Sequence, residues 1–400
     1  MRKELILHIG MHKCGSTAIQ FALDGYDKDG IRYAALSAPN HGYLLKRVFN
    51  PSGITKPIVD IPNNDRNAAN QRDQSVLRRE LKKEGVRKLI ISGETIPLLG
   101  RDGLLEFKRL ANEFVDKFTL VAYIREPISF ISSMTQQLVR AGFTLKQPPL
   151  PRYRFKFEPI IEIFGQENLI FRKFDRESLL AGSVVSDFCK ICGISAGDIK
   201  DITANDRSSL EVIQLVNAFN EYGVFNINQL PFTHARDQMC AFLDQYFSSP
   251  FEMDRDIITN QIDWEDVQWM EKIAGFDLAK APAGGWLRTI SLQQFLENIE
   301  PATIHRLEII LKDLSIPHGL DEMPSKLMER LYAYFLSLAF PDAGMVDDLR
   351  DIALKLDRDG SPLENAQKLM RIAAHLRPTG AFIAKKKSEF DRRLSERSKE

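Results

Sequence analysis

Short apolar runs alternate with helical patterns along the first half of the chain. The runs at 4–10, 88–92, 119–124 and 169–174 contain few polar residues, which is typical of strands buried on both faces of a parallel sheet. Apolar residues recur at helical spacing in the segments between and after them, at 16–25, 101–117, 128–140 and 183–192. This alternation predicts right-handed crossovers and an α/β fold with a parallel sheet flanked by helices.

The second half of the chain carries almost no strand pattern. Helices are predicted at 208–221, 235–246, 264–273, 302–313, 323–339, 345–356, 362–376 and 380–394. We therefore expect an α/β domain over 1–225, a helical extension of the same domain over 226–320, and an all-α C-terminal region over 321–400. One segment, 348–380, has the layout of a tetratricopeptide-like helical hairpin, although an ordinary hairpin has the same pattern. Residues 50–74 are rich in Pro, Asn and Asp and predict an irregular loop.

Composition narrows the classes of protein that fit. The 400 residues contain 54 Lys and Arg against 54 Asp and Glu, so the formal net charge is zero, unlike the basic excess of a dedicated nucleic-acid binder. Four cysteines cannot form a disulfide framework in a chain of this length, and such sparse use fits a reducing compartment. No run of about 18 apolar residues is present, so we expect no transmembrane segment and a cytoplasmic protein. The Cys189 and Cys192 pair ends an amphipathic helical pattern and is interpreted as buried, not as a redox or metal pair.

The strongest chemical signal is the segment GMHKCGST at 10–17, between a predicted strand and a predicted helix. A glycine-rich turn in this position directs backbone N–H groups toward an anion, and the helix N-terminus adds partial positive charge. Gly10 and Gly15 have the spacing of the nucleoside triphosphate loop, but Ser16 replaces its lysine, and Lys13 lies inside the loop. The pattern therefore predicts an anion site but does not support the binding of a magnesium-bound nucleoside triphosphate. A tight turn that binds no ligand is the alternative interpretation.

A second candidate anion site follows the strand at 119–124. Arg125 lies at the carboxyl end of that strand, where open α/β sheets bind ligands, and Ser133 follows two helical turns later. A planar guanidinium with a nearby hydroxyl suits a phosphate dianion. An arginine that forms a salt bridge at a helix start is the alternative interpretation.

These two motifs resemble the signatures of sulfotransferases that use 3′-phosphoadenosine 5′-phosphosulfate. The resemblance covers residues 3–225 and includes FGQENLIFRKFD at 164–175. It implies that the loop residues Lys13, Cys14, Gly15, Ser16 and Thr17 hold the 5′-phosphosulfate of this co-substrate, and that Arg125 and Ser133 hold its 3′-phosphate. It also implies no required metal, and a hydroxyl-bearing acceptor. The bacterial character of the motifs points to a saccharide or glycoconjugate.

The resemblance also indicates a general base. Cytosolic members have a histidine where this chain has Glu94, just after the strand at 88–92, and many bacterial members have glutamate there. A carboxylate at a strand end between two anion sites can accept the proton of an acceptor hydroxyl. His12 in the loop and His41 in APNHGYLL are competing candidates, and Glu94 as a cap of the next turn is the non-catalytic alternative.

Two other functions fit parts of the pattern. A nucleotide-dependent kinase would use the glycine loop, but Ser16 stands where its lysine belongs. A catalytically inactive nucleotide-binding or interaction protein would use the helical C-terminal half as a docking surface. Its only support is the hairpin at 348–380.

Overall fold

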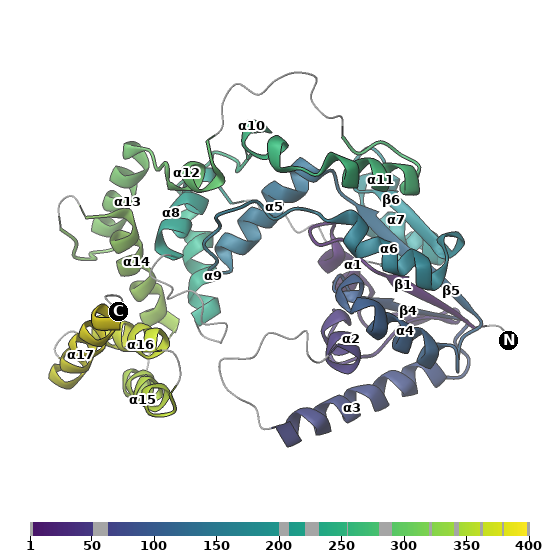
Figure 1. Cartoon of the computed structure of the whole chain (residues 1–400), viewed down its shortest axis with the longest axis horizontal. Coiled ribbons are helices and arrows are strands. Elements are labelled where there is room, and N and C mark those ends of the chain that lie inside the picture. Colours follow the sequence, from purple (N-terminus) through teal and green to yellow (C-terminus); the bar gives the residue numbers. More distant parts are fainter. Residues whose placement is uncertain are drawn as a thin grey trace. The chain divides into compact units, whose positions relative to one another are not determined.

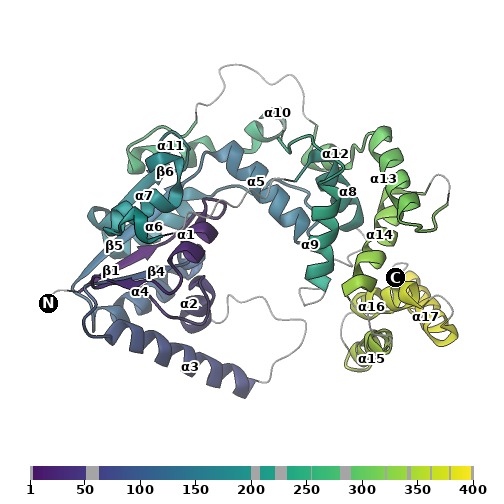
Figure 2. The same cartoon turned by 180° about the vertical axis from the view of Figure 1, so that it is seen from behind.

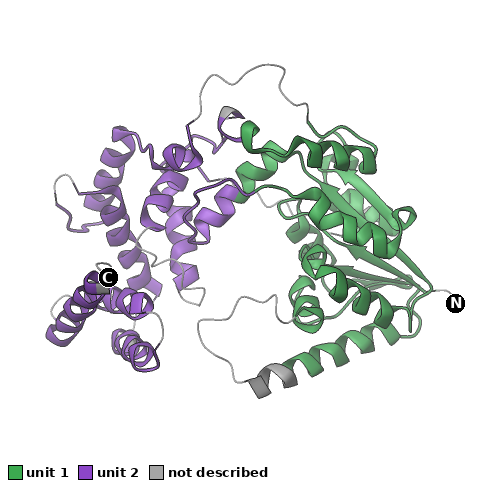
Figure 3. Ribbon diagram, viewed as in Figure 1, with its two compact units in different colours: residues 1–134, 150–205, 259–285 green, residues 135–149, 206–258, 286–400 purple. Residues whose placement is uncertain are grey.

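The computed structural model describes residues 3–50, 63–199, 208–220, 232–253, 255–279, 290–319, 322–339, 344–360, 363–377 and 380–397. The chain forms two compact units that are interleaved in sequence (Figure 3). Unit 1 contains residues 1–134, 150–205 and 259–285, and unit 2 contains residues 135–149, 206–258 and 286–400. The domain boundaries expected at 225 and 320 remain predictions.

Unit 1 is built on a six-stranded sheet in the order β2-β3-β4-β1-β5-β6 (Figure 1). The strands are β1 (Glu4–His8), β2 (Asp27–Lys28), β3 (Ile31–Tyr33), β4 (Lys88–Ser92), β5 (Lys117–Ile124) and β6 (Leu169–Lys173). All pairings are parallel except that between β2 and β3. The predicted α/β fold with a parallel sheet is confirmed, and all four strands expected from apolar runs are present.

The register places the functional motifs at one edge of this sheet. In β1, His8 is level with Ser92 of β4 and with Val121 of β5. The segments that follow β1, β4 and β5 therefore leave the sheet at its carboxyl edge, where open parallel sheets bind ligands. Gly10 and Glu94 come two residues after the ends of their strands, and Arg125 directly follows β5. Figures 1 and 2 show β1 between β4 and β5 from opposite sides.

Helices cover both faces of the sheet in unit 1. Helix α1 (Ser16–Leu23) packs against α7 (Val184–Cys192), and α4 (Gly100–Ala111) packs against α2 (Gly42–Phe49) and α6 (Tyr153–Phe164). Right-handed crossovers place these two groups on opposite faces, because β1 connects toward β3 whereas β4 connects toward β5. Helix α11 (Trp264–Ala274) packs against α6 and belongs to the same unit.

The irregular loop predicted over 50–74 is wrong for its second part. Helix α3 (Asn63–Lys82) begins inside it, and residues 51–62 lie outside the described part of the chain. Leu77 and Leu81, toward the C-terminal end of this helix, are fully buried. Glu80 adds an ion pair with Arg32, at 2.9 Å between Oε2 and Nε. Tertiary contacts thus support a helix that its polar first half does not indicate.

Unit 2 is helical in its described residues. It contains the second half of α5 (Pro127–Arg140), together with α8 (Leu210–Asn220), α9 (Phe232–Leu243), α10 (Arg255–Ile258), α12 (Leu292–Glu297), α13 (Pro301–Asp313), α14 (Pro324–Ala339), α15 (Gly344–Arg358), α16 (Leu363–Leu376) and α17 (Ala381–Arg397). The predicted helical C-terminal region is confirmed. Helix α16 packs against both α15 and α17.

The tetratricopeptide-like character of the hairpin formed by α15 and α16 remains a prediction. Its turn at 361–362 lies outside the described residues. Across the described ranges, no helix combines the length and apolar character needed to cross a bilayer.

Candidate functional site

The glycine loop runs from the end of the central strand β1 to the start of α1. The N–H groups of Ile9 and Met11 still pair with β5, donating to the carbonyls of Val121 and Tyr123 at 2.9 and 3.1 Å. The chain then leaves the sheet through left-handed backbone conformations, with φ of 74° at Gly10, 63° at Lys13 and 71° at Gly15. A strand-to-helix turn this tight needs such conformations, and glycine adopts them without strain.

The start of α1 presents free backbone donors. In the part of the chain that the structure describes, the N–H groups of Gly15, Ser16 and Thr17 find no acceptor. The Ser16 hydroxyl is buried and donates to the Met11 carbonyl at 3.4 Å, whereas Thr17 is exposed. Unpaired N–H groups with the partial positive charge of a helix N-terminus form an anion site.

The side chain of Cys14 is enclosed within the fold and does not point into the loop's solvent-facing side. Its side chain is fully buried, and burial raises the pKa of the thiol to about 12. The nearby charges of Arg125 and Lys156 oppose that rise but do not reverse it. The thiol is therefore protonated at neutral pH and is a poor nucleophile.

Arg125 joins the second motif to the glycine loop. Its Nη1 donates to the Lys13 carbonyl at 2.6 Å, and its Nε donates to the Ser129 hydroxyl at 2.7 Å. Its guanidinium also lies 5.6 Å from the centre of the Phe174 ring. Ser133, the predicted partner, lies one helical turn beyond Ser129 on the same face of α5 and is half-buried. The spacing of four residues from Arg125 was the available signal for Ser129, which the sequence analysis missed.

The backbone around Arg125 is fixed from both sides. The Glu126 carboxylate accepts the N–H groups of Ile128 and Ser129 at 3.1 and 2.7 Å, so the N-terminus of α5 is already capped. The Tyr153 hydroxyl, from α6, donates to the Arg125 carbonyl at 2.6 Å. These contacts fix the backbone from which the Arg125 side chain extends.

Glu94 lies in the turn between β4 and the 3₁₀ helix at Ile96–Leu98, against the glycine loop. Its Oε1 is 4.0 Å from Nε2 of His12. Burial raises the pKa of Glu94, and the charge of Lys13 opposes that rise. Burial, followed by the charges of Lys156 and Lys13, lowers the pKa of His12 to about 4. His12 is therefore uncharged at neutral pH, and the raised pKa brings the Glu94 carboxylate closer to the range in which it can accept a proton.

His41 lies in the core below this edge of the sheet. It precedes α2 and is 1% exposed. Its N–H donates to the Ser92 carbonyl at 2.9 Å, and its Nδ1 accepts the Ser92 N–H at 3.1 Å. Burial lowers its pKa to about 4. His8 is also fully buried, with Nδ1 2.8 Å from the Ser92 hydroxyl. The structure thus brings Lys13, His12, Glu94 and Arg125 together and leaves His41 out of that group.

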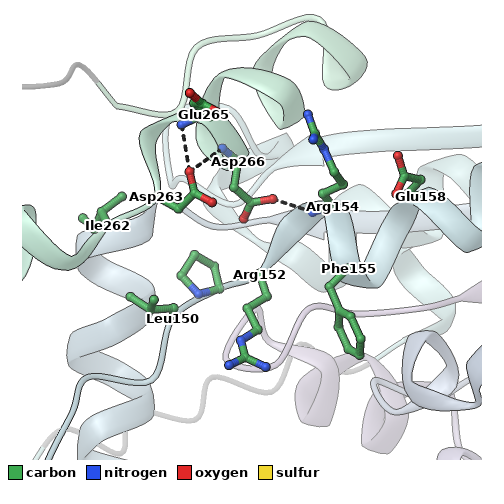
Figure 4. A pocket seen from close by; sticks show the side chains of 10 residues that line it. Leu150, Arg152, Arg154, Phe155, Glu158, Ile262, Asp263, Glu265 and Asp266 are labelled. Atoms are coloured by element: carbon green, nitrogen blue, oxygen red, sulfur yellow. Dashed lines mark hydrogen bonds between the residues drawn. The ribbon is translucent and has the colours of Figure 1, made fainter.

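A cavity of about 430 Å³ opens where α6 and α11 begin (Figure 4). It is lined by Leu150, Pro151, Arg152, Arg154, Phe155, Glu158, Ile262, Asp263, Glu265 and Asp266. The Asp266 carboxylate accepts the N–H groups of Tyr153 and Arg154, each at 2.7 Å, and so caps α6. Arg152 and Phe155 point the same way from the start of α6, and Phe155 is 65% exposed. The cavity therefore combines an exposed aromatic ring with charged groups of both signs.

The described ranges contain no group of three or more His, Cys, Asp or Glu side chains that could hold a metal ion. Cys189 and Cys192 are both buried in α7 as free thiols.

Comparisons with known proteins give one distant likeness. No family profile matches the chain, and no curated protein matches it. Among solved structures, a sulfotransferase from Alicyclobacillus acidocaldarius is similar at 14% sequence identity and a TM-score of 0.37, over 70% of this chain and 98% of that chain. A similarity this low identifies none of the site residues.

Proposed function

We propose that the chain is a sulfotransferase that moves a sulfuryl group from 3′-phosphoadenosine 5′-phosphosulfate to a hydroxyl of a saccharide. The observation that supports it most is the hydrogen bond from Arg125 to the Lys13 carbonyl. Two anion-binding patterns, 112 residues apart in sequence, meet there. A donor with phosphate groups at both ends of its ribose needs two such sites side by side.

In this proposal the glycine loop holds the phosphosulfate end of the donor. The free N–H groups of Gly15, Ser16 and Thr17 bind its oxygens, and Lys13 adds a full positive charge. Arg125, with the Ser129 and Ser133 hydroxyls on the same face of α5, binds the 3′-phosphate. The 3′-phosphate distinguishes this donor from ordinary adenosine nucleotides.

The transfer step needs a base and a stabilised leaving group. The acceptor oxygen forms a bond to sulfur, while the bond from sulfur to the bridging oxygen breaks and its electron pair stays on the 5′-phosphate. Glu94 accepts the proton of the acceptor hydroxyl, and Lys13 offsets the charge that develops on the bridging oxygen. Adenosine 3′,5′-bisphosphate and the sulfate ester are the products. Positioning and charge stabilisation supply most of the rate enhancement in this kind of group transfer.

The cavity at the start of α6 supports a saccharide as acceptor. A sugar ring can pack its apolar face on the exposed Phe155 ring, while its hydroxyls bond to Arg152 and Glu158. The cavity volume of about 430 Å³ lies within the range of small-ligand sites. A purely apolar acceptor would make no hydrogen bonds to these charged groups.

The first test is calorimetric binding of adenosine 3′,5′-bisphosphate and adenosine 5′-phosphate to the full chain. Two additional charge-assisted hydrogen bonds at about 1.5–3 kcal/mol each predict at least tenfold tighter binding of the bisphosphate. Equal affinities for the two nucleotides contradict the donor assignment. Magnesium-dependent turnover of ATP would instead identify the chain as a nucleotide-dependent kinase. Sulfuryl transfer from labelled donor to a panel of saccharides, phenols and lipids then tests the acceptor class.

A further inference from the structure

We propose that Lys156 is a second cation of the glycine loop and binds, together with Lys13, the anionic group that the loop holds. This inference rests on the proposed function only for the identity of the anion, which would be the phosphosulfate of the donor. The anion-binding role itself follows from the position of Lys156.

The fold holds Lys156 toward the loop. It lies at the end of the first turn of α6, a helix whose Tyr153 hydroxyl donates to the Arg125 carbonyl at 2.6 Å. Its Nζ lies 4.9 Å from the centre of the Phe130 ring on α5. Because residues three apart lie on one face of a helix, Lys156 leaves α6 on the same side as Tyr153, and its ammonium packs on the Phe130 ring.

The electrostatics show which residues the ammonium faces. The charge of Lys156 lowers the pKa of His12 more than that of Lys13 does, although Lys13 is adjacent to His12 in sequence. It also acts on the Cys14 thiol in the same loop. The Lys156 ammonium is thus near enough to His12 and Cys14 to act on both through its charge.

The ammonium lacks a carboxylate partner. In the described ranges no Asp or Glu oxygen lies within 4.0 Å of Lys156 Nζ. Asp266 is near enough to act on Lys156 through its charge, but both its oxygens accept N–H groups at the start of α6. The Phe130 ring offsets only part of the cost of removing an ammonium from water. A bound anion would supply the missing partner.

The titration of Lys156 gives this role a measurable signature. Burial lowers the pKa of Lys156 to about 8; Cys14 and Asp266 oppose that shift, and Arg152 adds to it. His12 also faces the ammonium but is uncharged above a pH of about 4. The charge of Lys156 is therefore lost as pH rises through about 8, and an anion that binds the charged form raises the pKa.

The experiment is calorimetry of inorganic pyrophosphate binding to the full chain at pH 7 and pH 9. Lys156→Met should bind about tenfold or more weakly than the parent at pH 7, because one charge-assisted contact is lost. At pH 9 the parent and Lys156→Met should bind pyrophosphate with similar affinity, because the lysine has lost its charge. Lys156→Arg should bind as tightly at pH 9 as at pH 7, since arginine stays charged. Lys190→Met removes an exposed lysine of α7 and should change nothing at either pH.

A measurement on the unaltered protein tests the proposal even if a Lys156 variant does not fold. Acylation of Lys156 by an amine reagent, followed by mass spectrometry, should be slowed several-fold by saturating pyrophosphate, while Lys190 should react at an unchanged rate. Equal pyrophosphate affinity of Lys156→Met and the parent at pH 7, or no protection of Lys156, overturns the proposal. If the chain shows no preference for adenosine 3′,5′-bisphosphate but gives these pyrophosphate results, the donor assignment is wrong and the anion-binding role of Lys156 is retained.

Discussion

Gly10 and Glu94 are in direct contact across the carboxyl edge of the sheet: a Cβ atom added at Gly10 would lie 2.9 Å from both Cα and Cβ of Glu94. The loop that would hold the donor and the carboxylate that would take the acceptor proton are therefore positioned by one close approach. A change in the path of either segment moves the other.

Replacement of Gly10 by alanine should disturb both segments. The left-handed φ of 74° costs an alanine about 1–3 kcal/mol, and the contact with Glu94 adds to that cost. Gly85→Ala is the matched control, because Gly85 has a φ of 76° but nothing within 4 Å of an added Cβ. Urea denaturation should show a larger loss of stability for Gly10→Ala, and only that variant should lose pyrophosphate affinity. Equal losses of stability in the two variants, with unchanged pyrophosphate affinity, would show that the two segments move apart at little cost to accommodate the added methyl group.

Replacement of Glu94 by glutamine tests the general base. The amide keeps the size of the side chain and removes the proton acceptor, so kcat should fall by about 10²–10⁴-fold while bisphosphate affinity is retained. Single-turnover transfer with the true acceptor is the measurement. His12→Ala, run in parallel, should keep most of the rate. If His12→Ala is inactive and Glu94→Gln is near normal, His12 is the base and Glu94 has a structural role.

The pH dependence of kcat/KM should have two limbs. Glu94 must be ionised to act, so the rate should fall as pH drops through its raised pKa. Lys156 must be charged to bind the donor, so the rate should also fall as pH rises through about 8. Lys156→Arg should remove the alkaline limb and leave the acid limb in place. A profile flat over about pH 5–9 in the parent would contradict both assignments.

Asp187 is predicted to stabilise the unit that carries the site. Burial raises its pKa, but hydrogen bonds from Arg172 and the Tyr123 hydroxyl outweigh that effect and hold the pKa below its usual value. A lowered pKa in the folded state contributes stability that is present above the unfolded value and is lost as pH falls through the folded one. Asp187→Asn should therefore cost about 3 kcal/mol at pH 7, and less in acid.

The control for Asp187 is Glu113→Gln, which breaks an exposed ion pair with Arg78 in the same unit. It should cost less than about 1 kcal/mol, because water screens such pairs. Urea unfolding at pH 7 and in acid measures both variants. Similar losses at pH 7 would show that burial adds nothing to the Asp187 interactions.

Strands buried on both faces and strongly amphipathic helices were predictable from sequence because their patterns are local. The β1, β4 and β5 strands are short, mostly apolar runs that are largely buried, and each lies where its pattern places it. The β6 strand also lies where it was predicted, but it is the edge strand and its residues are half-buried or exposed. The α3 helix was missed because most of its length is polar and its support comes from Leu77, Leu81 and the pair between Glu80 and Arg32. The strands β2 and β3 were missed because two or three residues are too few for a period to appear.

The candidate site likewise contains residues whose positions follow from local patterns and residues whose positions depend on long-range contacts. Its loop and the strand ends that carry Glu94 and Arg125 follow from sequence, because a parallel sheet brings such ends to one edge. The position of His41 could not be predicted, since it depends on paired hydrogen bonds to Ser92, which is 51 residues away. The same holds for Lys156, whose approach to the loop depends on the contacts of Tyr153 and Phe130 with neighbouring segments.

The burial of Cys14 gives the loop a built-in kinetic probe. Its thiol is fully enclosed and protonated at neutral pH, so an alkylating reagent can reach it only when the strand-to-helix turn transiently opens. With Cys189, Cys192 and Cys240 replaced, the modification rate of Cys14 would report the frequency of that opening, and a ligand seated on the loop would slow it in proportion to its occupancy. The residue that takes no part in the chemistry is thus the one through which occupancy of the site can be followed in time.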